Sequence, residues 1–155
     1  MTKKVPGLAE SIFEEILPLA KAGIKLFDTL PPAGLIIYAS GERRTLEVAD
    51  LFKSSMTKEM VVPVVDLIFS KEKEAIAIAI VAEAWVVTGK LKGFERSLEF
   101  FPGRVEGVLI SVYCRDHQDK LFALKILEGR KGLSLMENDG NIQEGRLVRD
   151  DPRRN

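Results

Sequence analysis

Residues 75–87 form the segment that most restricts how this chain can fold. The segment reads AIAIAIVAEAWVV and is apolar throughout except for Glu83. As a helix it would be apolar on every side, whereas a strand separates it into a face of isoleucines and a face of alanines. The isoleucine face would comprise Ile76, Ile78 and Ile80, and the alanine face Ala75, Ala77 and Ala79. We therefore predict a strand whose alanine face packs closely on a helix, while another element or a second subunit covers the isoleucine face.

The segments before this strand indicate two helices and another strand. Apolar residues at helical spacing predict a helix over residues 8–30, kinked or divided at Pro18. The β-branched run at 35–40 predicts a buried strand. After a turn, Thr45 is a plausible N-cap for a second helix over residues 46–69, bent at Pro63 or broken a few residues earlier.

The segments after it indicate antiparallel strands. Residues 105–114 and 121–127 predict one hairpin, and residues 133–136 and 146–148 predict a second around Asp139. Between the central strand and the first hairpin lies a long glycine-punctuated connection. The expected fold is α+β in two layers, with N-terminal helices packed on one face of a mixed sheet that ends in an antiparallel meander.

Length and composition predict one globular domain over residues 1–148 and a disordered tail over 149–155. Lysine plus arginine equals aspartate plus glutamate, 23 each, which argues against a dedicated nucleic-acid-binding protein. The surplus of basic residues in the connection at 88–104 is small. The longest apolar run is too short to span a membrane, no secretory signal is visible, and Cys114 is the only cysteine. We expect a cytoplasmic protein without a membrane segment.

A search for catalytic and metal-binding patterns gives little. The single histidine, His117, lies in a polar turn, and with Cys114, Asp116 and Asp119 it does not supply the ligands of a structural zinc site. No calcium-loop or phosphate-loop pattern is present. A weak anion site is conceivable at residues 39–45, where two arginines would precede a helix N-terminus. We expect no metal and no cofactor.

Glu83 is the residue that raises a functional question. Alternation places it on the face of Ala79 and Val81, together with Trp85, where an unpaired carboxylate would be costly. Its pKa could be raised for acid catalysis, a cation could pair with it, or the strand end could be exposed. We favour pairing, with Arg104 as the partner because it opens the next strand of a hairpin; Arg96 and Lys92 are alternatives. Glu106 could supply a second carboxylate.

The stretches AEAWVV and FFPGRVEGVLISV carry a resemblance to uncharacterised bacterial proteins. These proteins have Glu-Ala-Trp at the end of an apolar strand, followed by a proline, an arginine and a glutamate before the next strand. The corresponding residues here are Glu83, Ala84, Trp85, Pro102, Arg104 and Glu106. The resemblance implies no particular activity, but it groups Glu83, Arg104 and Glu106 together.

Two functions fit these observations. The first is a non-enzymatic, self-associating interaction module, a homodimer that buries the apolar sheet face which the helices leave uncovered. The alternative is a small-molecule-binding protein or enzyme whose site is lined by Glu83, Trp85, Arg104 and Glu106. Since no convincing nucleophile or second base accompanies Glu83, the sequence favours the first function.

Overall fold

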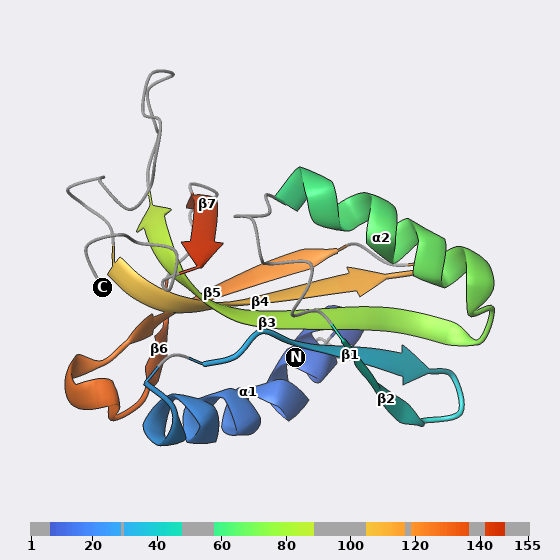
Figure 1. Cartoon of the computed structure of the whole chain (residues 1–155). Helices are drawn as coiled ribbons and strands as arrows, with labels where there is room; N and C mark the ends of the chain where they lie inside the picture. The colour runs from blue at the N-terminus through green and yellow to red at the C-terminus, as the bar shows by residue number, and fades with distance from the viewer. Residues whose placement is uncertain are drawn as a thin grey trace, which may run out of the picture.

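The computed structural model describes residues 7–28, 30–47, 58–88, 105–116, 119–136 and 142–147. One sheet lies between the helices α1 and α2 (Figure 1). The helices are α1 (Leu8–Leu26) and α2 (Lys58–Lys71). The strands are β1 (Ala33–Tyr38), β2 (Arg43–Leu46), β3 (Ala75–Thr88), β4 (Val105–Cys114), β5 (Lys120–Ile126), β6 (Leu133–Leu135) and β7 (Ile142–Leu147). A short 3-10 turn, η3 (Glu128–Arg130), connects β5 to β6.

The strand order is β2-β1-β3-β4-β5-β6, and every pairing among the described strands is antiparallel. The α+β class and the β4–β5 hairpin are confirmed, but the expectation of a mixed sheet is wrong. The expected hairpin between the last two strands is also wrong, because β7 pairs with residues Ala84–Thr88 of β3. On that edge of β3, β1 pairs only with residues up to Val81, so β7 supplies partners for the peptide groups beyond it.

The two faces of β3 are covered by different helices. Ala77 and Ala79 pack in a core with α1, β4 and β5, as the small side chains predicted. Ile78 and Ile80 pack in a second core with Val61 of α2 and its neighbours. The helices therefore lie on opposite faces of the sheet, where the sequence suggested one face, and no second subunit is needed to cover these isoleucines.

A bulge at the start of β3 shifts the alternation. Ile37 of β1 pairs with Ala77, but Tyr38 pairs with Ala75, so Ile76 is an extra residue on β3. Ala75 consequently joins the α2 core, and Ile76 packs at the edge of the α1 core. The predicted faces of these first two residues are therefore reversed, because the extra residue in β3 changes the side to which they point.

Several predicted boundaries differ from the structure. α1 is one helix that contains Pro18 and ends at Leu26, so it does not reach residue 30. Thr45 lies within β2, which pairs along the edge of β1, and it is not an N-cap. A helix from 46 is therefore wrong at its start, and α2 begins at Lys58. The anion site suggested at residues 39–45 required a helix to begin there. Residues 43–46 form a strand, so that suggestion is wrong.

Some predictions fall outside the described residues: the connection at 89–104, which includes Arg104, the turn residue His117, and the tail beyond 147. In the part of the chain that is described, neither α1 nor α2 has the length and apolar character needed to cross a membrane.

Candidate functional site

Glu83 is fully buried, and its carboxylate accepts hydrogen bonds from distant parts of the chain. Its Oε1 lies 2.6 Å from Nη2 of Arg130 and 2.9 Å from the backbone nitrogen of Leu30. Its Oε2 lies 3.2 Å from Nη1 of Arg130. The two-pronged contact neutralises the buried charge and satisfies both oxygens. Among the alternatives, a structural ion pair is thus the one observed, and exposure at a strand end is wrong.

The arginine that the structure places on Glu83 comes from the turn between β5 and β6, whereas the partner predicted from the sequence, Arg104, lies outside the described residues. Arg130 adopts a left-handed backbone conformation with φ of 55°, directly after Gly129 at 70°. Such a conformation is unfavourable for a residue with a side chain, and it persists where other contacts determine it. Here the Nε of Arg130 also donates to the carbonyl oxygen of Ile24 at 2.7 Å, near the end of α1. Arg130 thus joins β3, α1 and its own turn.

Carboxylates dominate the electrostatics around this arginine. The hydrogen bond that Arg130 donates to Glu83 is the main cause that raises the pKa of Arg130, and the charges of Glu106 and Asp28 add to it. The guanidinium is therefore permanently charged, and its charge is balanced within the protein.

The four residues proposed from the sequence can now be placed. Glu106 is half-buried on β4, and its charge acts on Arg130, so the structure does bring Glu83 and Glu106 to one arginine. The backbone of Trp85 pairs with that of Glu106, but the position of the Trp85 side chain is not among the described features. Arg104 lies outside the described residues.

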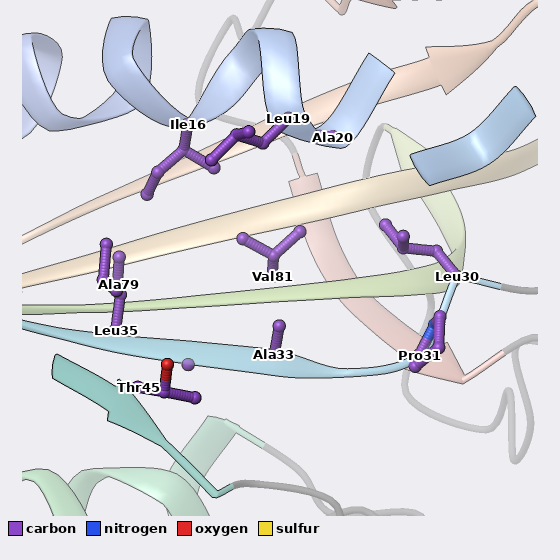
Figure 2. A pocket seen from close by; sticks show the side chains of 11 residues that line it. Ile16, Leu19, Ala20, Leu30, Pro31, Ala33, Leu35, Thr45, Ala79 and Val81 are labelled. Carbon is purple, nitrogen blue, oxygen red and sulfur yellow. The ribbon is translucent and has the colours of Figure 1, made fainter. Parts of the chain in front are cut away.

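An apolar pocket of about 250 Å³ lies next to this ion pair, between α1 and the strands β1 and β3. In Figure 2 Ile16 and Leu19 reach down from α1, while Val81 points up toward them from β3. The lining consists of Ile16, Leu19, Ala20, Leu30, Pro31, Ala33, Gly34, Leu35, Thr45, Ala79 and Val81. Among the described residues of this lining, Thr45 is the only one with a polar side chain, so the pocket suits an apolar molecule.

The pocket arises from small residues and from the position of α1. The helix packs mainly over β4 and β5, where Phe13 stacks on Phe122 with ring centroids 4.2 Å apart. It consequently leaves part of β1 uncovered. The side chains of Ala20, Ala33 and Ala79, which line the space between α1 and this part of the sheet, are too short to fill it.

The buried ion pair holds one wall of the pocket. Leu30 and Pro31 form the end of the pocket, beyond the last turn of α1 (Figure 2). The backbone of Leu30 is held by Glu83, and its side chain lies against Gly23, where an added Cβ would come within 2.5 Å of the leucine Cδ1. Glu83 therefore shapes the pocket without entering it.

A second ion pair joins α1 to β2, at the end of the pocket away from Leu30 and Pro31. The Nε and Nη2 of Arg43 on β2 donate to the Oε2 and Oε1 of Glu15 on α1 at 2.9 and 2.8 Å. This bond lowers the pKa of Glu15. Thr45 follows on the same side of β2, and in Figure 2 its hydroxyl oxygen points toward the pocket.

Other candidate chemistry is weak in the described part of the chain. Cys114 is buried, and burial raises the pKa of its thiol, which disfavours the reactive thiolate. The side chain of Asp119 accepts a hydrogen bond from the backbone of Cys114, as expected of a turn residue. No group of three or more potential metal ligands occurs among the residues described.

Comparison with known protein families, curated proteins and solved structures found no match to this chain.

Proposed function

We propose that this protein is a non-enzymatic binding protein that takes a small apolar molecule into the pocket between α1 and β1. The observation that carries the proposal is the described part of the pocket lining, in which ten apolar residues surround one hydroxyl-bearing residue, Thr45. Such a lining offers dispersion contacts and displacement of water, and the lining residues that the structure describes include no titratable side chain for acid–base chemistry. The nearest buried carboxylate, Glu83, is already bonded to Arg130.

This proposal keeps the ligand-binding alternative considered from the sequence, but it places the ligand in the pocket under α1 and not at Glu83 and Glu106. Glu83 is fully buried and forms the support behind Leu30, so a ligand would contact the support only through that leucine. Glu106 faces the same arginine and is likewise not part of the pocket lining.

The test is a titration of the ¹⁵N-labelled protein with 1-octanol, followed by ¹H–¹⁵N correlation spectra. We expect saturable shifts around Ala20, Leu35 and Ala79. An Ala33→Phe variant should abolish them, because Ala33 is an exposed lining residue and a phenyl ring there would occupy the space. Ala39→Phe is the matched control, since Ala39 is an exposed alanine outside the lining. Absence of saturable shifts in the folded wild-type protein would overturn the proposal.

Self-association remains a second candidate, and exposed side chains on α1 favour it. Leu19 and Leu26 are 69% and 78% exposed, they lie two helical turns apart on one side of α1, and Phe27 follows them. These residues, and not the isoleucine face of β3, would form the contact. A neutral net charge presents no overall repulsion between two copies.

Light scattering after size-exclusion chromatography distinguishes this second candidate. A dimer should become a monomer in Leu26→Lys, which places a charge in the proposed contact. It should persist in Leu67→Lys, since Leu67 is also an exposed leucine but lies on α2, on the other side of the sheet. A wild-type monomer at micromolar concentration would rule out the homodimer.

A further inference from the structure

The pocket and its borders also restrict the chemical class of the ligand. We infer that the ligand is an uncharged molecule of about eight to ten carbon atoms with one hydrogen-bonding end, which lies at Thr45. This inference rests on the proposed function. The size follows from the volume of about 250 Å³, because an apolar cavity of about 150 Å³ in another protein holds benzene.

The first argument concerns charge. The ion pairs at both ends of the pocket are internally satisfied: Glu15 binds Arg43 on one side, and Glu83 binds Arg130 on the other. The amide of Leu30, at the end wall, already donates to Glu83. A carboxylate or ammonium group at the Thr45 end would lose part of its water, and Arg43, the described arginine beside it on β2, is already paired with Glu15.

The second argument concerns orientation. At the Leu30 and Pro31 end the wall is made of apolar side chains, and the described donors there are engaged. At the β2 end, Thr45 is exposed to solvent, and its hydroxyl points toward the pocket in Figure 2. A hydroxyl group donates and accepts hydrogen bonds, so it suits an alcohol, an aldehyde or an amide equally. The apolar part of the ligand would therefore lie under α1 and its polar end would lie at the solvent side.

A series of eight-carbon probes at one pH separates the possibilities. Dissociation constants for 1-octanol, octanoate and octylammonium are measured at neutral pH by the same spectral titration. We expect 1-octanol to bind about tenfold more tightly than either ion, since partial burial of an unpaired charge is unfavourable. Thr45→Val, which keeps the shape and removes the hydroxyl, should weaken octanol binding by about two- to tenfold. Thr45→Ser should retain most of the affinity.

The possible failures are distinct. If none of the three probes binds to the folded protein, the proposed function itself fails. If the ions bind as tightly as 1-octanol, or if Thr45→Val leaves octanol affinity unchanged, the pocket still binds apolar matter but the inference about ligand class is overturned. Competition of octanoate with the Glu15–Arg43 pair would appear as shifts of the Arg43 side-chain resonances, and it would also contradict the inference.

Discussion

A single buried arginine contact determines how the centre of this protein is assembled. Arg130 is 22% exposed, while its partner Glu83 is fully buried, so the pair lies at the boundary between core and solvent. Ion pairs of this kind add little compared with apolar residues of the same shape, but removal of one partner leaves the other charge unpaired. The contact therefore adds little net stability, but the fold is destabilised when either partner is removed.

We predict that Arg130→Met lowers the free energy of unfolding by about 3–5 kcal/mol, because it removes the two-pronged guanidinium contact from a fully buried carboxylate. The double variant Glu83→Leu with Arg130→Met should recover part of this loss. Urea unfolding of the wild type, both single variants and the double variant measures the coupling. A loss below about 1 kcal/mol in Arg130→Met would contradict the structural role.

Tyr38 offers the opposite case, a polar atom whose removal should help. Its hydroxyl is buried and has no hydrogen-bond partner among the described residues. An unsatisfied buried hydroxyl destabilises a fold by about 1–3 kcal/mol, so Tyr38→Phe should leave stability unchanged or raise it. Thermal unfolding measures the change. Tyr113→Phe, on the same side of the sheet, is the control: burial raises the pKa of Tyr113, and its hydroxyl has a hydrogen bond with Ser111 that this variant would remove.

At the scale of elements, two arginines fix the ends of two helices. Arg130 donates to Ile24 near the end of α1, and Arg115 donates to the carbonyls of Phe69 and Glu72 at the end of α2. The last carbonyls of a helix have no partners within it, so each arginine satisfies groups that would otherwise need water. Both arginines follow strands, which attaches each helix end to the sheet on its own face.

Arg115 should therefore be needed for the end of α2. Its Nε also donates to the carbonyl oxygen of Ala75 at 2.7 Å, and its guanidinium lies 4.8 Å from the centre of the Phe69 ring. We predict that Arg115→Met destabilises the fold by about 2 kcal/mol, as expected for charged hydrogen bonds. Amides in the last turn of α2 should also exchange faster with deuterium. Arg44→Met, at a more exposed arginine on β2, should change both much less.

The fold was predictable where a pattern is local. Ile78 and Ile80 alternate with alanines, and this alone indicated β3, while the polar turn after Cys114 indicated the β4–β5 hairpin. The partner of Glu83 was not predictable in this way. Arg130 is brought to it by a left-handed turn 47 positions along the chain, and a sequence shows no such proximity. Arg104 was chosen because it is near in sequence to the next strand.

The error at β2 has a similar cause. β2 contains two arginines and a threonine, a composition typical of a turn or a helix start, and it becomes a strand because the edge of β1 is available to it. The pocket could not be predicted, because it depends on where α1 lies across the sheet. Its only sequence signal was the small size of Ala20, Ala33 and Ala79, residues that belong to three different elements.

At the scale of the whole molecule, β3 is the element that holds the others together. It pairs with β4 on one edge and with β1 and then β7 on the other, and a helix packs on each face. We predict that amides of residues 77–81 exchange most slowly with deuterium and open only on global unfolding. Exchange measured by NMR checks this; slower exchange in the edge strand β2 than in β3 would contradict it.

The composition of β3 has a consequence outside the native state. Residues 75–82 combine high strand propensity with no charge and no proline, which is the signature of segments that form intermolecular cross-β contacts. In the folded protein both edges of this segment are occupied, by β1 and β4. A variant that weakens the pairing of β1 with β3 would expose an unpaired, aggregation-prone edge of β3. We therefore expect refolding yield and soluble expression to fall before ligand binding is lost.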